Sequence, residues 1–257
     1  MKNIFSSRMA LAIGGLFMFG LVLSSCSKLD NDDNNSDVPV AGLMAFNLAP
    51  DKSSVGFAIS GNSITNVGLP FTSFTGNYLA IYPGARTIET YDYVSGSAIA
   101  STAGTFDAEK YYSTFLIGAN NVYKNLVVED KFDTLSASNG MAYVRYINAI
   151  PDSSAPSVTI ATGGANVVNE NAAYTRVSDF AAITPGSVDI TVNNGGTINA
   201  TRNITLEEKK AYTVLLIGIP GSSSTEQAVQ IKFITNGTLT DSTSQRTVSA
   251  TRSAVTN

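Results

Sequence analysis

The sequence has no histidine and a single cysteine, Cys26, and each scarcity excludes a class of chemistry. Without histidine the chain has no Ser-His-Asp triad and lacks both the commonest general base and the usual zinc ligand. One cysteine cannot form a disulfide within the chain, so the fold depends on core packing and sheet hydrogen bonds. Gly-x-Ser-x-Gly, Gly-x-Gly-x-x-Gly and P-loop motifs are also missing. We therefore expect no enzyme, no cofactor and no metal site.

Charged residues are few, at 14% of the chain, and helix-forming Leu/Glu/Lys/Ala patterns are scarce. The 21 glycines, 11 tyrosines and many threonines instead favour strands and turns, and 257 residues are enough to bury two cores. Two of the 16 basic residues, Lys2 and Arg8, lie in the first 25 residues, which leaves 14 basic against 20 acidic residues beyond them. An acidic chain without a basic patch predicts no nucleic-acid partner.

Residues 1–25 have the pattern of a signal peptide. A positive start is followed by an uncharged, mostly apolar run from Met9 to Leu23, which is short for a membrane-spanning helix. Leu23-Ser24-Ser25-Cys26 resembles the bacterial lipobox, which implies cleavage between Ser25 and Cys26 and lipidation of Cys26 with more than one acyl chain, such as palmitate. We expect the membrane to be a partner through this lipid.

Residues 26–39 form an acidic segment without aromatic residues, which predicts a flexible tether. Asp30, Asp32 and Asp33 resemble the start of a calcium loop, but the glycine and the distal glutamate of an EF-hand are missing. Acidic residues after the cysteine also resemble the surface-export signal of lipoproteins in Bacteroidetes-type bacteria. The expected location is the outer membrane, either surface-exposed or facing the periplasm.

One stretch, Lys110–Gly118, returns about a hundred positions later as Lys210–Gly218. Both copies are short apolar runs of aromatic and β-branched residues, which predicts buried strands. Earlier landmarks recur in the same order: Phe46–Asp51 corresponds to Tyr146–Asp152, and Pro83-Gly84 corresponds to Pro185-Gly186. The chain is therefore predicted to contain a duplicated unit.

Short strands with frequent turn signals predict an all-β fold of two tandem antiparallel β-sandwich domains. We expect the domains over residues 40–135 and 140–239, joined by a short link, with a flexible Ser/Thr-rich tail over residues 240–257. Val188–Val192 alternates apolar and polar residues, as in a strand with one wet face. Ser97–Phe106 and Tyr111–Gly118 are expected to pair across the connection between them.

A strand ending in Asn-Ala-x-Pro-Asp, a later Pro-Gly and a Lys-x-Tyr-Thr-Val-Leu-Leu-Ile-Gly strand resemble the family called domain of unknown function 4397. The resemblance covers about residues 41–239, and the matching positions are Asn148, Pro151, Asp152, Pro185, Gly186, Tyr212 and Gly218. It implies immunoglobulin-like sandwiches, which this family often arranges in tandem in bacterial lipoproteins. It implies no catalytic residues.

The leading hypothesis is a non-catalytic cell-envelope lipoprotein that serves in binding, adhesion or structure, with a glycan or an envelope protein as partner. The alternative is an envelope hydrolase with a carboxylate pair, for which Asp51 and Asp152 are the first suspects. Each follows a proline at a strand end, however, where a turn-capping aspartate is the ordinary explanation. A third hypothesis treats the domains as spacers.

Two further sets of residues are open to interpretation. The dense tyrosines of the first unit stack on sugars, anchor a protein interface, or are ordinary strand residues at the sandwich rim; they are Tyr78, Tyr82, Tyr91, Tyr93, Tyr111 and Tyr112. Asp133-Thr134-Leu135 and Asp241-Ser242-Thr243 resemble a short O-glycosylation motif of Bacteroidetes-type secreted proteins, with Thr134 and Ser242 as the acceptors.

Overall fold

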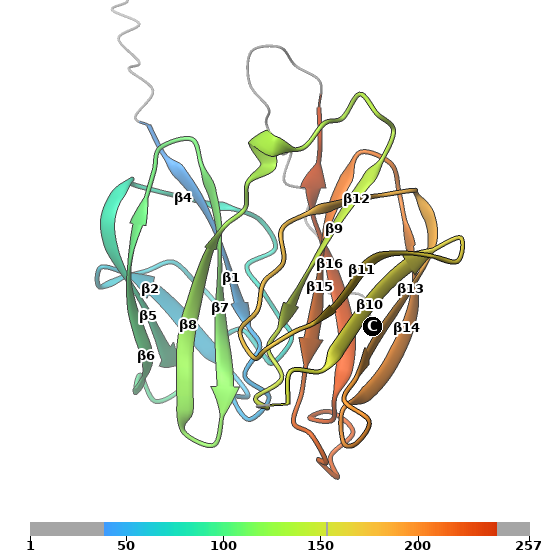
Figure 1. The fold of residues 1–257 in the computed structure, drawn as a ribbon. Coiled ribbons are helices and arrows are strands. Elements are labelled where there is room, and N and C mark those ends of the chain that lie inside the picture. Colours follow the sequence, from blue (N-terminus) through green and yellow to red (C-terminus); the bar gives the residue numbers. More distant parts are fainter. Residues whose placement is uncertain (1–38, 153, 241–257) are drawn as a thin grey trace, which may run out of the picture. The chain divides into compact units, whose positions relative to one another are not determined.

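The computed structural model describes residues 39–152 and 154–240, whose strands form two repeats of eight. Figure 1 shows the two repeats side by side. The first repeat contains β1 (Ala41–Asn47), β2 (Val55–Ile59), β3 (Asn62–Ser63), β4 (Leu79–Ile81), β5 (Gly84–Asp92), β6 (Ala98–Phe106), β7 (Tyr111–Ala119) and β8 (Val122–Glu129). The second contains β9 (Ala142–Asn148), β10 (Ser157–Thr162), β11 (Ala165–Asn171), β12 (Ala181–Ile183), β13 (Gly186–Asn193), β14 (Asn199–Leu206), β15 (Lys210–Ile217) and β16 (Gln230–Thr238). A single 3-10 turn, η1 (Phe132–Thr134), is the one helical element of the described residues.

Each repeat is a sandwich of two four-stranded sheets. Inner sheet 1 has the order β4-β1-β7-β8 and outer sheet 1 the order β3-β2-β5-β6. Inner sheet 2 (β12-β9-β15-β16) and outer sheet 2 (β11-β10-β13-β14) repeat this order strand for strand. All strand pairs are antiparallel except β1 with β7 and β9 with β15, which are parallel. The predicted all-β fold of two tandem sandwiches is confirmed.

The core of each sandwich lies between its inner and outer sheets. In β13, Val188, Ile190 and Val192 are fully buried against inner sheet 2, whereas Ser187 and Asp189 lie on the other face. The alternation predicted for this strand is therefore confirmed, and it follows from the two-residue period of a strand. A corresponding cluster that includes Phe57, Ile88 and Leu116 fills the first sandwich.

The repeated strands β7 and β15 are buried on both faces. Tyr112 and Leu116 of β7 lie in the first sandwich core, whereas Phe115 and Ile117 belong to a separate apolar cluster that includes Leu215 of β15. This explains the continuous apolar runs in the sequence, since a strand with one wet face would alternate. Both repeats belong to one compact unit, in which the layers follow as outer sheet 1, inner sheet 1, inner sheet 2 and outer sheet 2 (Figure 1).

The expected pairing of Ser97–Phe106 with Tyr111–Gly118 is wrong. β6 pairs with β5 in outer sheet 1, and the chain then crosses to inner sheet 1, where β7 pairs with β1 and β8. Burial explains the crossing. Ser101 and Thr105 give β6 an exposed face, whereas every position of β7 after Tyr111 is buried.

The segment between the repeats packs against both of them. Leu135 and Ala137 are buried in a small cluster with second-repeat residues that include Tyr143, and Tyr78 and Tyr111 of the first repeat pack against this cluster. Chain flexibility at the link is therefore limited by side-chain packing, in agreement with its short length.

Candidate functional site

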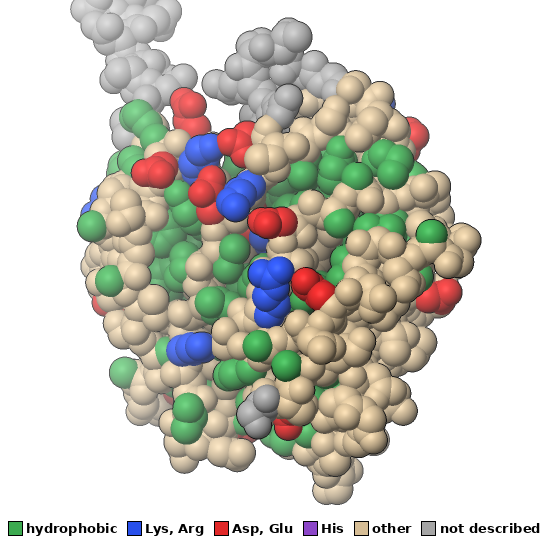
Figure 2. Space-filling view, viewed as in Figure 1, with side chains coloured by type: hydrophobic (Ala, Val, Ile, Leu, Met, Phe, Trp, Pro, Cys, Tyr) green, Lys and Arg blue, Asp and Glu red, His purple; other side chains and the backbone are tan. Residues whose placement is uncertain are grey.

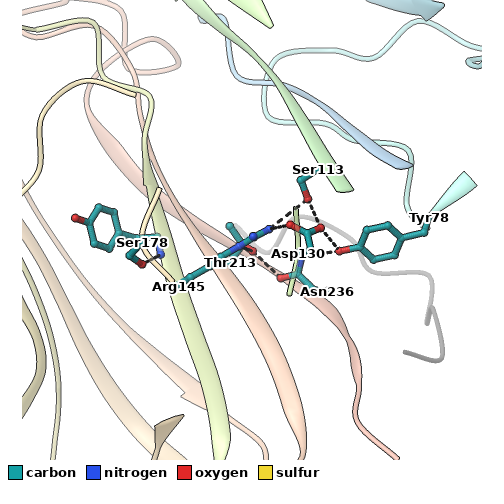
Figure 3. A network of polar contacts seen from close by, with 8 residues as sticks. Tyr78, Ser113, Asp130, Arg145, Ser178, Thr213 and Asn236 are labelled. Atoms are coloured by element: carbon teal, nitrogen blue, oxygen red, sulfur yellow. Dashed lines mark hydrogen bonds and ion pairs between the residues drawn. The ribbon is translucent and has the colours of Figure 1, made fainter. Parts of the chain in front are cut away.

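A buried group of polar side chains joins the two inner sheets (Figure 3). Asp130 directly follows β8, and its Oδ1 forms an ion pair with Nη2 of Arg145 on β9 at 2.5 Å. The hydroxyls of Tyr78 and Ser113 donate hydrogen bonds to Oδ2 of Asp130, each at 2.6 Å. The side chains of Asp130 and Arg145 are 0% and 2% exposed. Each repeat therefore buries one charge that the other repeat neutralises.

Side chains of both repeats surround the guanidinium of Arg145. Nε of Arg145 donates to Thr213 Oγ1 at 3.0 Å, and Nη2 donates to Ser113 Oγ at 3.3 Å. The guanidinium also lies over the ring of Phe180, 4.6 Å from its centroid, which is cation–π geometry. These contacts use the planar guanidinium on its edges and on a face, as arginine is suited to do.

Asn236 closes the group between Thr213 and Tyr78. Thr213 Oγ1 donates to Asn236 Oδ1 at 2.6 Å, and Asn236 Nδ2 donates to the Tyr78 hydroxyl at 3.2 Å. Burial, reinforced by the negative charge of Asp130, raises the pKa of Tyr78 well above its ordinary value. All six polar side chains have partners within the group, so it holds the repeats together. We refer to Tyr78, Ser113, Asp130, Arg145, Thr213 and Asn236 as the inter-repeat network.

Sequence reasoning missed this network, apart from naming Tyr78 among the tyrosines. One signal was present, because Arg145 is a charged residue inside the otherwise neutral strand Ala142–Asn148. A buried charge needs a partner, so its position alone could have prompted the search for an acid. The sequence does not indicate which acid pairs with Arg145, because Asp130 lies in the other repeat.

Charged side chains follow the outer rim of the contact between the repeats (Figure 2). Lys131 and Asp179 come from different repeats and lie 3.5 Å apart, and Lys110 pairs with Glu129 at 3.8 Å and with Asp133. A groove of about 310 Å³ opens at this rim, with Phe180 and Arg145 in its lining. The charges of opposite sign are interleaved, which is typical of the solvated rim of an interface.

A larger groove, of about 470 Å³, lies where loops of the two repeats meet. The first repeat contributes Pro50–Ser53 and Pro70–Thr72, and the second contributes the loop before β16 and the start of that strand. Gln227 Nε2 donates a hydrogen bond to the carbonyl oxygen of Pro50 at 3.2 Å, which ties the two sides together. We refer to this feature as the loop groove.

The loop groove exists because the repeats differ at one hairpin. β7 and β8 are joined by Asn120-Asn121 alone, whereas the corresponding connection in the second repeat runs from Gly218 to Val229. The longer connection carries Ser224, Glu226 and Gln227 into the lining of the groove. A long, repeat-specific loop on a rigid scaffold is the usual place for a binding function.

Both repeats match one protein family. Residues 41–155 and 142–251 each match the family described as Domain of unknown function (DUF4397). The chain belongs to this family. A comparison with curated proteins finds no match. The tandem arrangement of DUF4397 units predicted from the repeated strands is confirmed.

The asparagine of the DUF4397 motif braces the loop after the first strand of each repeat. Asn148 Nδ2 donates to the carbonyl of Ala172, and its Oδ1 accepts from the amide of Ile150. Asn47 makes the corresponding bonds to Leu69 and Ala49. Both asparagines are buried, so their role is to satisfy loop backbone groups that water does not reach.

Tyr212 and Gly218 of the matching positions, like Tyr112 and Gly118, also have structural roles. The hydroxyls of Tyr112 and Tyr212 accept hydrogen bonds from the amides of Asp107 and Glu207, both at 3.0 Å. Gly118 and Gly218 have φ values of +119° and +109°, and a Cβ on either would lie within 2.2 Å of a backbone oxygen. Both tyrosines are buried, Tyr112 in the core of the first sandwich and Tyr212 in that of the second.

Pro185-Gly186, the remaining matching pair, lies where β13 begins, as Pro83-Gly84 does for β5. Both glycines have positive φ, at +121° for Gly186 and +102° for Gly84. The backbone conformation at the strand start therefore requires glycine in both repeats.

The two aspartates suspected of catalysis are both engaged in hydrogen bonds, Asp51 with the β7–β8 hairpin and Asp152 within its own loop. Asp51 Oδ2 accepts hydrogen bonds from the Tyr123 hydroxyl at 2.6 Å and from the amide of Asn120 at 2.8 Å. Asp152 Oδ1 accepts from the amide of Ser154 at 2.7 Å, and hydrogen bonding to Ser154 lowers the pKa of Asp152. A lowered pKa is unsuited to a general acid near neutral pH, so the turn-capping interpretation fits Asp152 better. Asp51 lies at the loop groove.

The tyrosines do not gather on one exposed face. Among those singled out from the sequence, only Tyr82 and Tyr93 are exposed residues, at 66% and 39%. Tyr112 is buried, and Tyr78 and Tyr111 form an edge-to-face pair with centroids 5.0 Å apart. Packing within the fold therefore accounts for most of this aromatic content.

Several predicted features lie outside the described residues: the signal peptide, the cleavage site at Ser25 and Cys26, most of the tether, most of the tail and Ser242. Thr134 is described, and it is exposed in η1 with its hydroxyl donating to the carbonyl of Lys131 at 2.7 Å. Across residues 39–152 and 154–240, no helix is long and apolar enough to span a membrane. The same ranges contain no cluster of three or more acidic, histidine or cysteine side chains suited to a metal ion.

Proposed function

We propose that this DUF4397 protein is a lipid-anchored, non-catalytic binding module of the bacterial cell envelope, which holds its ligand in the loop groove. The observation that carries the proposal is the loop connecting β15 and β16, which is long only in the second repeat and lines this groove. The cores of the two repeats are built alike. The repeats differ instead in a surface loop, which is where a ligand or partner would make contact.

The lining of the loop groove suits a neutral, hydroxyl-rich ligand, and we therefore place a glycan first among partners. Lys52 offers donors from the first repeat, and Glu226 and Gln230 offer acceptors and donors from the second. Phe71 and two prolines supply apolar surface beside these groups. Many polar side chains beside a small apolar surface suit a ligand that is rich in hydroxyl groups.

Binding arrays of envelope glycans test this function with the mature chain from residue 26 onward carrying Cys26→Ser, which keeps the protein soluble. We expect at least one class of glycan to bind, and Lys52→Ala to weaken it about tenfold, the loss expected for one charge-assisted hydrogen bond. Lys131→Ala is the matched control, because it removes a lysine from the other groove and is expected to leave binding unchanged. Absence of binding on broad arrays, or equal loss in both variants, would overturn the proposal.

The anchor is a separate part of the proposal, supported by the lipobox-like Leu23–Cys26. Two or more acyl chains on Cys26 give durable attachment, because each buried CH₂ contributes about 0.8 kcal/mol. We expect Cys26→Ser to move the protein from the membrane fraction to the soluble fraction and to abolish labelling by a palmitate analogue. Protease accessibility on intact cells then separates the surface-exposed location, which the acidic tether favours, from the periplasmic one.

We also infer that the likeness to immunoglobulin domains is one of architecture. In each repeat an upstream backbone amide donates a hydrogen bond to the hydroxyl of a strand tyrosine. This contact resembles the tyrosine corner of those domains, and it supports the inference. Immunoglobulin domains arrange their strands as ABED and CFG, whereas these repeats have the orders 4-1-7-8 and 3-2-5-6.

A further inference from the structure

The contact between the repeats uses the same positions on both sides. Phe46 and Ile147 correspond in the two repeats, as do Phe115 and Leu215, and all four belong to the apolar cluster between the inner sheets. Such a contact resembles the isologous interface of a homodimer, although it forms within one chain. Two identical faces would pair equally well with their own equivalents on other molecules, so a difference between the faces must favour the pairing of the first repeat with the second.

At four pairs of equivalent positions in the inter-repeat contact, the two repeats carry different side chains. The register of the strands matches Arg145 with Met44 of the first repeat. Asp130 and Asn236 also correspond, because they directly follow Glu129 and Thr235, the partners of the equivalent tyrosines Tyr112 and Tyr212. Tyr78 and Phe180 both lie one residue before the short edge strand of their inner sheets. Ser113 and Thr213 also correspond. The carboxylate is therefore supplied by one face only, and the guanidinium by the other face only.

The charges decide which faces fit. In the observed contact, Asp130 meets Arg145 at 2.5 Å, and both side chains are excluded from water. If two first repeats paired in the same geometry, Asp130 would meet Met44, and a carboxylate would be buried without a cation. If two second repeats paired, Arg145 would meet Asn236, and the guanidinium would be buried without an anion. Removing one partner of a buried ion pair is strongly unfavourable, and each like-with-like pairing would do so twice.

We propose that the Asp130–Arg145 pair is a recognition element, which makes the face of inner sheet 1 accept the face of inner sheet 2 and reject its own equivalent on a second copy of the chain. The pair selects the partner more than it adds stability, because well-packed apolar residues often replace a buried ion pair without loss. The rest of the network supports this selection. Tyr78 and Ser113 hold the carboxylate, and Thr213 and Phe180 hold the guanidinium.

The double variant Asp130→Asn with Arg145→Met tests the proposal in the mature chain carrying Cys26→Ser. It removes both charges, and it gives each face a methionine and an asparagine at the equivalent positions. After refolding at concentrations from about 1 µM to about 1 mM, size-exclusion chromatography with light scattering measures the dimer fraction. We expect the unsubstituted chain to stay monomeric and the double variant to form dimers as the concentration approaches about 1 mM, the effective concentration typical of short linkers.

Each result bears on the proposal. The single variants are expected to unfold at lower urea concentration than the double variant, since each leaves one buried charge unpaired. The reciprocal exchange, Asp130→Arg with Arg145→Asp, keeps the faces complementary and is expected to remain monomeric. A double variant that stays monomeric throughout would overturn the proposal. A double variant that fails to fold would overturn it too, because the pair would then be needed for stability itself.

Discussion

Ser113 and Thr213 occupy equivalent places in two copies of one strand, and both accept a hydrogen bond from the guanidinium of Arg145, at 3.3 and 3.0 Å. Only one arginine lies between them, so the duplicated strands share a single cation. The hydroxyl that duplication placed on each inner sheet thereby became part of one network spanning both repeats. The strands that hold each sandwich together also hold the sandwiches to one another.

Thr213→Val should show how much this network contributes. The change nearly keeps the shape of the side chain, but it removes the acceptor for Arg145 Nε and the donor to Asn236. Because both partners are buried, we expect the free energy of unfolding to fall by about 2 kcal/mol. Urea denaturation followed by circular dichroism measures this change. Thr105→Val, on the exposed face of β6, is the control and should stay within about 0.5 kcal/mol of the unsubstituted chain. If Thr213→Val changes the free energy of unfolding as little as the control does, the network does not stabilise the contact between the repeats.

The fold was predictable where burial differs between the two faces of a strand. Val188–Val192 alternates because one face meets the core and the other meets water, so its pattern alone identified it. The continuous apolar run of β7 identified a strand but not its partners. Neighbours in sequence usually pair, and that rule placed β6 beside β7; the exposed face of β6 instead requires the outer sheet.

The network was not predictable, because its members become neighbours only when the repeats meet. Tyr78 and Asn236 are hydrogen-bonded across 158 positions of sequence. The local pattern of apolar and polar residues carries no information about such a distant contact. Arg145 inside a buried strand was the one local anomaly, and it indicated the need for a partner without indicating which one. The loop groove was similarly hidden, because its two sides come from opposite ends of the folded region.

The paired tyrosines give a second prediction. Tyr112→Phe and Tyr212→Phe each leave a backbone amide, of Asp107 or Glu207, without its acceptor. We expect each change to lower the free energy of unfolding by about 1 kcal/mol, and the two effects to add, since the residues lie in separate sandwich cores. Urea denaturation measures the two single variants and the double variant. Tyr82→Phe, at an exposed ring, is the control. If the double variant loses far less unfolding free energy than the two single variants lose together, the hydrogen bonds are not independent.

Two glycines with nearly equal φ values allow the stability cost of backbone strain to be separated from that of a steric clash. Gly118 and Gly186 have φ values of +119° and +121°, but only Gly118 lacks room for a Cβ, which would lie 2.0 Å from the carbonyl oxygen of Val122. Gly186→Ala should therefore cost about 1 kcal/mol from backbone strain alone. Gly118→Ala should cost clearly more, by about 2 kcal/mol or above, because the hairpin backbone must also move. Thermal and urea unfolding of the two variants test this difference, and equal losses would show that the hairpin yields easily.

Alkaline pH provides the last prediction, through Tyr78. A tyrosine in the unfolded chain ionises near pH 10, whereas burial and the charge of Asp130 hold the pKa of Tyr78 well above that value in the folded protein. Between the two pKa values the folded state keeps a proton that the unfolded state has lost. The contribution of Tyr78 is thus complete below about pH 10, and it falls by about 1.4 kcal/mol per pH unit above it.

Comparison with Tyr78→Phe isolates this contribution. Near pH 8 the variant should be less stable by about 2 kcal/mol, because Asp130 loses a hydrogen-bond donor. From pH 10 to 11 the difference should shrink, since phenylalanine has no proton to lose. Tyr146 and Tyr212, whose pKa values are also raised by burial, titrate in both proteins and cancel in the comparison. Urea denaturation at pH 8, 9, 10 and 11 measures the difference. A constant difference over this range would mean that Tyr78 ionises equally in the folded and unfolded chains, and hence that its hydroxyl is not held in the buried network.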